Sequence, residues 1–365
     1  MKAVCKENMC AGCTACLSVC KRDAISIVDS LSHYNAVIDT AKCIDCGACY
    51  RVCPVNSPAK LKTPISWYQG WAEDAIRVNS SSGGAATAII KGFLENGGSV
   101  CSCVFENGRF CFKIVSDLQG ACDFAGSKYV KSDPSGVFSE IRKLLHNEKK
   151  VLFIGLPCQV AGLKNYVGDH EKLYTVDLIC HGSPSPLLLE KYLKESGVEL
   201  SNARTVSFRN KDSFGLCVDS KRIAPVSVSD SYTVTFLSAV DYTENCYSCR
   251  YATFERVSDI TLGDAWGCER SELKKGVSLI LCQSQKGNEL LESSGLTLDE
   301  ADIENAKQHN HQLRHPSVKH KGREAFFNTL NKGGSFRRAA FRAMPKDRLK
   351  QNIKYVYLKI RKGTQ

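Results

Sequence analysis

The sequence predicts three parts: an α+β module at the N-terminus, a mixed α/β domain after it and a helical basic C-terminal tail. The first prediction comes from a cysteine pattern that occurs twice between residues 10 and 53. The second comes from strand-like and helix-like apolar runs that alternate over residues 67–330, an order typical of α/β folds. The third comes from charge, because residues 337–365 of the tail (331–365) carry ten Lys or Arg and one acidic residue.

The N-terminal module, residues 1–60, is organised by the cysteine repeat. Residues 10–20 and 43–53 both have the spacing C-x2-C-x2-C-x3-C, and six of the eleven positions are identical. Three cysteines at this spacing hold three irons of one 4Fe-4S cluster, and the fourth reaches the other cluster. The repeat therefore predicts an α+β two-cluster ferredoxin module. Its ligand sets are Cys10, Cys13, Cys16 and Cys53, and Cys43, Cys46, Cys49 and Cys20.

Structural zinc is the alternative, because zinc sites also use C-x2-C pairs. Zinc takes four ligands per site and needs neither a third cysteine at the same spacing nor a second copy of the pattern. One departure from the usual ferredoxin run is Lys21, which follows Cys20 where proline is usual. That departure affects a local turn and removes no ligand. Cys5 belongs to neither ligand set and is expected to be a small buried side chain.

The composition points to redox or metal chemistry in the cytoplasm. The chain has 365 residues, 43% of them hydrophobic, and no apolar run long enough to span a bilayer. No basic and apolar leader of the secretory type is evident. Twenty cysteines in such a chain indicate metal or redox sites rather than disulfides. The net charge is +11, of which residues 337–365 contribute +9.

Hydrophobic patterns and turn residues predict the remaining secondary-structure elements. A hairpin is predicted from residues 25–28 and 36–38, and a linker from residues 56–66. Two later strands end at Gly155-Leu156-Pro157-Cys158 and at Cys180-His181-Gly182, and ligands gather at the carboxyl ends of such strands. Strands are predicted at 100–105, 109–115, 150–155, 172–180, 204–208, 216–223, 232–237, 258–264 and 277–282, and helices at 85–95, 135–146, 186–197, from 287 and mostly from 299 on.

The second domain carries, in this order, the motifs SSGG, GLPCQVAGLK, DLICHGSPSP, a further C-x2-C and SDITLGDAWG. With the ferredoxin module in front of them, they resemble the family of coenzyme F420 hydrogenase/dehydrogenase beta subunits. That family includes a plant hydroxymethyl-chlorophyll reductase and bacterial members encoded in polysaccharide-biosynthesis loci, and the basic tail is most similar to the bacterial members. The resemblance covers residues 10 to about 330. It implies FAD, a further iron-sulfur cluster, and electron transfer between one-electron donors and a two-electron acceptor.

The resemblance also implies which residues hold FAD, although no G-x-G-x-x-G or Walker A motif is present. The turn at 80–84 opens a helix and offers backbone N–H groups to a phosphate. A plain capped loop, a solvated lysine and an aspartate that bonds its own loop are the alternatives at these positions. His181 is either a proton donor or a structural side chain. The predicted cofactor-binding residues are Ser82, Gly83, Gly84, Lys128, Gly155, Pro157 and Asp264.

A third cysteine set is predicted outside the module. Cys158 and Cys180 stand at strand ends, and Cys246 and Cys249 form the C-x2-C pair. Together they supply four thiolates, the number that a 4Fe-4S cluster takes. A zinc ion at Cys246 and Cys249 with two other ligands, or plain buried thiols, are the alternatives.

The leading hypothesis for function is an FAD-dependent iron-sulfur oxidoreductase of polysaccharide biosynthesis. Its substrate is not readable from the sequence, and a small molecule or a lipid-linked compound is expected. Its electrons would come from a ferredoxin-like or other low-potential donor. An electron-transfer subunit that serves a partner enzyme is the alternative from another class. A third possibility is a cluster that acts as a Lewis acid.

The tail shows helical spacing of apolar residues among its basic ones. This pattern suits a helix docked on its own domain, or a helix on an anionic membrane surface that makes the protein peripheral to the membrane. Nucleic acid is not expected, because no aromatic stacking platform accompanies the charge. The apolar positions are Leu349, Ile353, Val356, Tyr357 and Ile360.

Overall fold

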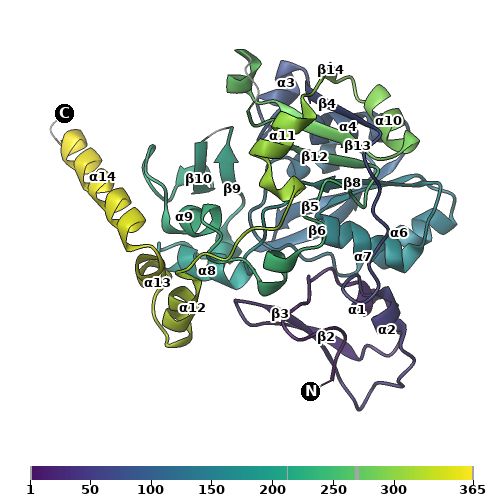
Figure 1. Ribbon diagram of the computed structural model, residues 1–365, viewed down its shortest axis with the longest axis horizontal. Coiled ribbons are helices and arrows are strands. Elements are labelled where there is room, and N and C mark those ends of the chain that lie inside the picture. The colour runs from purple at the N-terminus through teal and green to yellow at the C-terminus, as the bar shows by residue number, and fades with distance from the viewer. Residues whose placement is uncertain (1, 212, 268–270, 364–365) are drawn as a thin grey trace.

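An eight-stranded mixed sheet forms the centre of the computed structural model, which describes residues 2–211, 213–267 and 271–363 (Figure 1). In spatial order its strands are β14 (Thr297–Glu300), β4 (Ser66–Trp71), β13 (Ser278–Cys282), β12 (Ile260–Asp264), β8 (Leu173–Leu178), β7 (Val151–Gly155), β5 (Ser99–Glu106) and β6 (Arg109–Val115). The four strands β12, β8, β7 and β5 run parallel, and the strands outside them pair antiparallel. The predicted mixed α/β domain is therefore confirmed.

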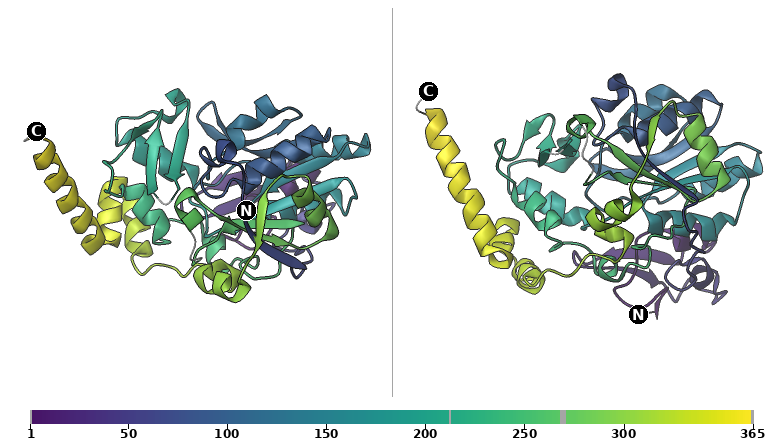
Figure 2. Two further views of the ribbon diagram at one scale, coloured as in Figure 1. Left: turned by 90° about the horizontal axis from the view of Figure 1, so that it is seen from above. Right: turned by 45° about the horizontal axis from the view of Figure 1, so that its top comes forward.

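Helices cover both faces of this sheet because its central strands are apolar on both sides. Phe153 of β7 packs under one pair of helices, whereas its neighbours Leu152 and Ile154 pack under another pair. The sheet is thus the middle of three layers (Figure 2). The first pair is α6 (Val137–His146) and α7 (Pro157–Val167), and the second is α4 (Ala85–Glu95) and α10 (Gln285–Glu292).

The carboxyl ends of β7, β8 and β12 meet at one edge of the sheet. The register places Gly155 at the end of β7 beside Asp177 of β8. Cys158 follows as the second residue of α7, and Cys180 lies two residues after the end of β8. Asp264 is the last residue of β12. Predicted site residues that are far apart in the sequence therefore gather at this edge.

The ferredoxin-like module lies below the sheet domain, against α7 (Figure 1). Its three-stranded sheet has the order β1-β3-β2, and the predicted hairpin is its β2–β3 pair. Each cysteine run leads into a short helix. The elements are β1 (Lys2–Ala3), α1 (Ala15–Val19), β2 (Ile25–Asp29), β3 (Tyr34–Ile38) and α2 (Ala48–Val52).

The module and the sheet domain share one hydrophobic core. Cys13 and Val52 of the module belong to the same buried cluster as Phe153 of the sheet. Gly162 of α7 makes the contact close, because a Cβ there would lie 2.8 Å from the Cys13 Sγ. The side-chain amide of Asn165 donates to the Ser57 carbonyl at 2.7 Å and to the Val52 carbonyl at 3.3 Å. The module is therefore held rigidly on the helix that carries Cys158.

A second core lies beside the sheet and is built from a small hairpin sheet and several helices. The hairpin consists of β9 (Val206–Asn210), β10 (Ser213–Val218) and β11 (Lys221–Arg222), in the order β11-β10-β9. The helices are α8 (Pro186–Lys194), α9 (Ser231–Leu237), α12 (Arg323–Asn331) and α13 (Phe336–Ala343). Further short helices are α3 (Asp74–Arg77), α5 (Leu118–Ala121) and α11 (Ile303–His309).

The strand predicted at 232–237 is wrong, because these residues form α9. Its alternation of aromatic and β-branched residues resembles a strand. The Asp230 carboxylate instead accepts the backbone N–H of Thr233 at 2.9 Å and caps the helix. Tyr232 and Phe236 are both buried, so packing outweighs the modest helix propensity.

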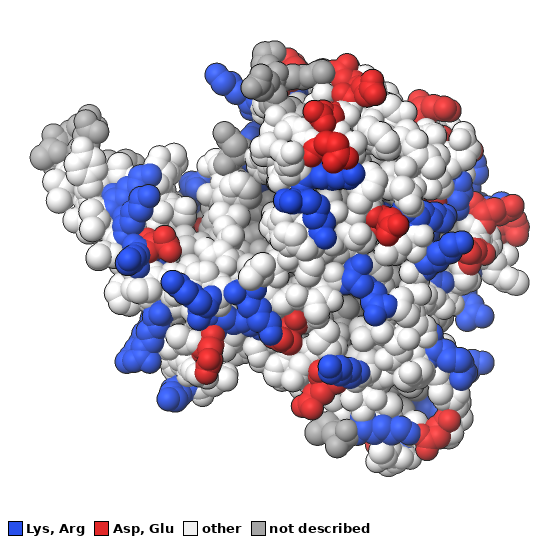
Figure 3. Space-filling model, viewed as in Figure 1, with Lys and Arg blue, Asp and Glu red and all other residues white. Residues whose placement is uncertain are grey.

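The tail contains a long helix, α14 (Pro345–Gly363), which projects from the body of the molecule (Figures 1 and 2). Its first turns are attached to the second core, where Arg348 donates to the Ser229 carbonyl. Farther along, Ile353 is 61% and Val356 is 55% exposed. The helix is therefore not docked along its apolar side, which corrects that alternative. Lys and Arg gather over α12, α13 and α14 (Figure 3).

No helix within the described residues is long and apolar enough to cross a membrane.

Candidate functional site

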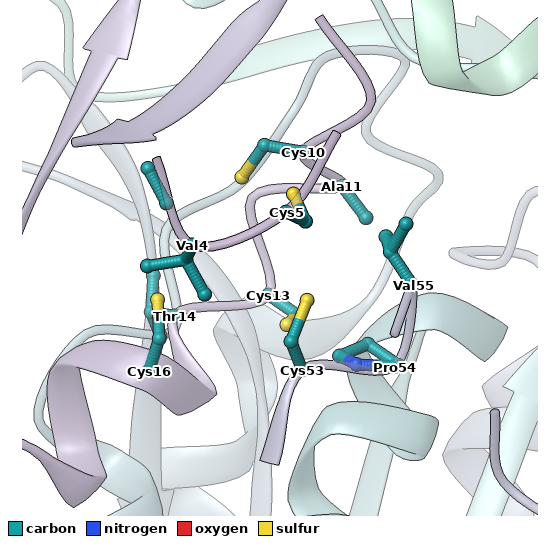
Figure 4. A pocket seen from close by; sticks show the side chains of 11 residues that line it. Val4, Cys5, Cys10, Ala11, Cys13, Thr14, Cys16, Cys53, Pro54 and Val55 are labelled. Carbon is teal, nitrogen blue, oxygen red and sulfur yellow. The ribbon is translucent and has the colours of Figure 1, made fainter. Parts of the chain in front are cut away.

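The first cysteine set, Cys10, Cys13, Cys16 and Cys53, surrounds a small hollow in the module (Figure 4). All four thiols are buried, and apart from cysteines and Thr14 the lining is apolar. An enclosed, mostly apolar space ringed by thiols is the setting that a 4Fe-4S cluster requires. The other lining residues are Val4, Cys5, Ala11, Ala36, Pro54 and Val55.

The backbone of the two cysteine runs has the same shape at the same repeat positions. Gly12 and its counterpart Asp45 both have a positive φ, as do Thr14 and its counterpart Gly47. In each run an amide points back at a sulfur: the Gly12 N–H donates to the Cys10 Sγ and the Asp45 N–H to the Cys43 Sγ, each at 3.4 Å. Amides directed at sulfur stabilise thiolate ligands. The donor set therefore fits a 4Fe-4S cluster at each run.

The second cysteine set, Cys20, Cys43, Cys46 and Cys49, lies nearer the surface. Cys46 is exposed, and the other three are half-buried. The exposed side chains of Lys2 and Asp45 form an ion pair next to this set. The second set is thus the part of the module that a partner protein can approach.

Cys5 differs from the plain buried residue that the sequence predicts, because its thiol is a neighbour of the first set. It makes side-chain hydrogen bonds with Cys10 and Cys53 and lines the same hollow. The hydrogen bond from Cys5 is the largest influence that lowers the pKa of Cys53, to about 6. Nothing in the spacing of the cysteines indicates this contact, because β1 brings Cys5 to the site.

The structure brings the third cysteine set together at the sheet edge. Cys158 lies in the first turn of α7 and Cys180 beyond β8, while Cys246 and Cys249 lie in and just after a 3-10 turn (Glu244–Ser248). Cys158 and Cys249 line one hollow, and Cys246 and Cys249 act electrostatically on both Cys158 and Cys180.

Burial makes the thiolates of the third set unfavourable without a cation. It raises the pKa of Cys158 to about 12 and that of Cys180 well above its ordinary value. Burial likewise raises the pKa of Cys249. A bound metal group reverses this preference, because it needs deprotonated thiols as ligands. The described residues include no group of three or more His, Cys, Asp or Glu placed to hold a single metal ion.

The first and third sets share a wall. A second hollow is lined by Cys158, Cys249 and Tyr251, and it shares Ala11, Pro54 and Val55 with the hollow of the first set. Cys158 also lies one helical turn from Gly162, which touches Cys13. Gly162 is a packing position beside the site that the sequence did not single out, although it stands in the GLPCQVAGLK motif.

The residues predicted to hold FAD are mostly engaged within the protein. The Lys128 ammonium donates to the carbonyls of Asp123, Phe124 and Ala125, which uses its three donors. The Asp264 carboxylate accepts two bonds from Arg209, at 2.7 and 3.1 Å. Neither side chain is available to a phosphate in this arrangement.

The turn at 80–84 is also fixed by packing. A Cβ on Gly83 would lie 2.5 Å from the Gly70 carbonyl oxygen, so close approach to β4 requires glycine there. The Ser82 hydroxyl donates to the Val277 carbonyl at 2.9 Å. Gly84, with φ +84°, precedes α4 without a side-chain cap, which leaves the first backbone N–H groups of that helix as donors.

Gly155 and Pro157 position the third set. Gly155 ends β7, and Pro157 starts α7, where its missing N–H costs nothing. Next to Cys180, burial lowers the pKa of His181 to about 4, so its imidazole is neutral near pH 7. Its Nδ1 lies 2.6 Å from the Gln312 amide nitrogen. A neutral, hydrogen-bonded ring suits the structural alternative.

Two family matches agree with these modules. Residues 9–57 match the 4Fe-4S dicluster domain, and residues 148–305 match the family defined by the C terminus of the coenzyme F420 hydrogenase/dehydrogenase beta subunit.

Two known proteins are similar to this chain in sequence. The chain is 27% identical over 325 residues to a coenzyme F420-dependent sulfite reductase of Methanocaldococcus jannaschii, covering 83% of this chain and 49% of that protein. It is 25% identical over 209 residues to the F component of the F(420)H(2) dehydrogenase of Methanosarcina mazei, covering 53% of this chain and 59% of that protein. The chain thus spans about half of the length of the first relative and 59% of the second.

A chain of the F420-reducing NiFe hydrogenase complex from Methanosarcina barkeri has a similar fold, with a TM-score of 0.50 at 16% identity, over 74% of this chain and 95% of that chain. These comparisons agree with iron-sulfur electron transfer. They give no support to the predicted FAD or to the predicted link with polysaccharide biosynthesis.

Proposed function

We propose that the chain, which is similar to the beta subunits of coenzyme F420 hydrogenase/dehydrogenase, is an iron-sulfur electron-transfer subunit that serves a partner redox enzyme. The alternative hypothesis from the sequence thus replaces the stand-alone FAD enzyme as the leading one. The observation that carries the proposal is the order of the three cysteine sets, from the exposed second set through the buried first set to the third set at the sheet edge.

Each set has a distinct task in this proposal. 4Fe-4S clusters, when bound, accept and release single electrons at low potential. The exposed residues around Cys46 give a ferredoxin-like or other low-potential partner access to the second set. Buried walls around the first set exclude water and hold its ligands in place. The third set lies beside Asp264 and His181 at the carboxyl edge of the sheet, where a substrate or a partner's cofactor would exchange electrons.

A third 4Fe-4S cluster is supported by four half-buried cysteines at the sheet edge and by the wall shared with the first set. Zinc at Cys246 and Cys249, or buried thiols without metal, are the alternatives that the test below separates. The first-turn N–H groups of α4 are the part of the predicted FAD site that stays available, and no step of the proposal passes through FAD.

Metal analysis of the anaerobically reconstituted full chain tests the proposal. We expect about twelve iron and twelve acid-labile sulfide per chain, the content of three 4Fe-4S clusters. Cys246→Ser should lower the iron by about four and leave the ferredoxin signals in the electron paramagnetic resonance (EPR) spectrum unchanged. Cys122→Ser, at an exposed cysteine outside the three sets, is the control. Eight irons in the unaltered protein would remove the third cluster, and bound zinc would replace it.

Transfer to a partner is tested by kinetics, with a reduced low-potential ferredoxin as the electron donor. Reduction of the clusters should fall steeply with salt and with charge changes near Cys46, because the contact is made at the surface. Acid release and chromatography of the yellow cofactor decide whether FAD is bound. A flavin at one per chain would restore the FAD-dependent oxidoreductase hypothesis.

We also propose that the basic helix α14 contacts an anionic membrane surface. The exposed apolar residues Ile353 and Val356 and the surrounding positive charge support this proposal. Each basic residue near such a surface contributes about 1 kcal/mol at low salt. The full chain should then sediment with anionic liposomes at low salt and be released at high salt, whereas a variant that ends at Met344 should stay in the supernatant in both.

A further inference from the structure

Two buried polar side chains from different elements occupy the junction between the first and third cysteine sets. Lys131 is 4% exposed and comes from the loop before α6, and Tyr251 is 5% exposed and follows the C-x2-C pair. Neither stands out in the sequence. Among the described residues Lys131 has no carboxylate partner, and the Tyr251 hydroxyl has no hydrogen-bond partner.

Lys131 is a buried cation without a carboxylate. Its ammonium donates to the Ala11 carbonyl at 3.1 Å and lies 5.0 Å from the centre of the Tyr34 ring. The ion pairs found among the described residues include none between Lys131 and an Asp or Glu. Ala11 lies between Cys10 and Cys13 and lines both hollows, so the charge stands in their common wall.

The charge acts on both sets. The Lys131 ammonium interacts electrostatically with Cys10 of the first set and with Cys158 of the third set. A negatively charged group bound by these thiols would balance the charge of the Lys131 ammonium, which no carboxylate among the described residues balances.

Tyr251 supplies the second group. Its hydroxyl is buried and has no hydrogen-bond partner within the part of the chain that the structure describes. The side chain lines the second hollow with Cys158 and Cys249. Both of these thiols, and Cys13 of the first set, act electrostatically on its hydroxyl. A phenol O–H in this place is a donor near thiols of both sets.

We propose that Lys131 and Tyr251 are positioning residues for electron transfer between the first and third sets, where the ammonium balances the negative charge of the bound clusters and the hydroxyl donates a hydrogen bond to their sulfur. Positive charge and hydrogen-bond donors stabilise the form that holds the extra electron, so both groups raise the reduction potential at the junction. The part that concerns the third set rests on the proposed function, whereas the part that concerns the first set rests only on the dicluster module.

Redox titration of the reconstituted full chain, followed by EPR, tests the proposal. Tyr251→Phe removes only the hydroxyl, and Lys131→Met removes the charge while keeping most of the stem. Each should shift the reduction equilibrium of the junction clusters by about tenfold toward the oxidised form, or about 59 mV for a one-electron couple. The second set should not move and is the internal control.

Two further variants separate charge from shape. Lys131→Arg should keep the potential of the first set within about threefold, since it keeps the charge. Lys286→Met is the matched control, because Lys286 also donates to backbone carbonyls and lies 5.4 Å from a tyrosine ring, at the opposite edge of the sheet from the cysteines. It should leave every potential unchanged.

Unchanged potentials in a Tyr251→Phe protein with full iron would overturn the assignment of Tyr251, and the same result in Lys131→Met would overturn that of Lys131. If Lys131→Met does not fold, Lys131→Arg still tests the role of the charge. An altered potential of the first set in Lys131→Arg would overturn the assignment of Lys131. Failure of the proposed function gives a different result: eight irons remove the third cluster, yet Lys131→Met must still shift the first set.

Discussion

The two halves of the ferredoxin-like module start from nearly the same sequence and end in different surroundings. The runs at 10–20 and 43–53 share six of eleven residues, the same positive-φ positions and the same 3.4 Å amide-to-sulfur contacts. Yet the thiols of the first set are buried, whereas Cys46 of the second is exposed. Local sequence thus determines the geometry with which each run would bind its cluster. Packing against the second domain determines how buried the environment of that cluster is.

The differences between the halves lie where the first run meets other elements. Gly12 leaves room for the Tyr34 ring, which a Cβ would approach to 3.0 Å, whereas its counterpart Asp45 is exposed and pairs with Lys2. Cys5, whose repeat counterpart is Ile38, adds a thiol to the first half only. The repeat therefore offers matched pairs of substitutions that test burial with the same ligand chemistry.

The largest effect is expected from removing one ligand in each half. Cys13→Ser and Cys46→Ser should both lose about four irons, since each set holds one 4Fe-4S cluster. Cys13 lies in the core shared with α7, so its loss should lower the apparent unfolding free energy by more than about 4 kcal/mol, as for loss of a structural metal. Cys46→Ser should stay within about 0.5–3 kcal/mol.

Iron analysis and anaerobic denaturant titration measure both quantities on the same samples. Equal stability losses in the two variants would show that the module is not anchored through its first set.

Much of this comparison could be predicted from the sequence, because cysteine spacing depends only on local backbone reach. The eight ferredoxin positions and the strand ends at Gly155 and Asp264 follow from such local patterns. The difference in burial between the two cysteine sets was not predictable from the sequence. It arises from packing against α7, which lies more than a hundred residues away along the chain. Strands β4 and β14 were missed for the same reason, as their pairing is long-range.

The predicted cofactor residues show where local reasoning fails. Gly83 and Lys128 belong to suitable motifs, yet both are explained by packing and by carbonyl contacts inside the domain. A glycine or a lysine in a motif does not reveal whether backbone or ligand fills the space beside it. The surroundings of Lys131 and Tyr251 could not be predicted either, because each depends on two elements that meet only in the folded chain.

A smaller effect that sharpens the comparison concerns Gly162. Gly→Ala inside a helix ordinarily stabilises a protein by about 0.5–1 kcal/mol. In α7 the added Cβ would lie 2.8 Å from the Cys13 Sγ, and overpacking of this kind costs about 1–3 kcal/mol. Gly162→Ala should therefore be destabilising in denaturant titration, and it should broaden the EPR signal of the first set alone. A more stable protein with unchanged spectra would mean that α7 does not press on the first run.

The smallest effect is expected at Cys5. Its thiol is a weak donor to Cys10 and Cys53, and a hydrogen bond at the low end of the usual range is worth about 0.5 kcal/mol. Removing it withdraws a donor that favours the reduced cluster, so Cys5→Ala should shift the reduction equilibrium of the first set about twofold toward the oxidised form. The second set, which has Ile38 at the matching position, should keep its potential. EPR-monitored redox titration of Cys5→Ala measures the potentials of the first and second sets separately. Cys122→Ala, at an exposed cysteine outside the sets, is the control. A shift shared by both halves would mean that Cys5 acts on the fold of the module rather than on one cluster, and loss of four irons would make Cys5 part of the ligand set.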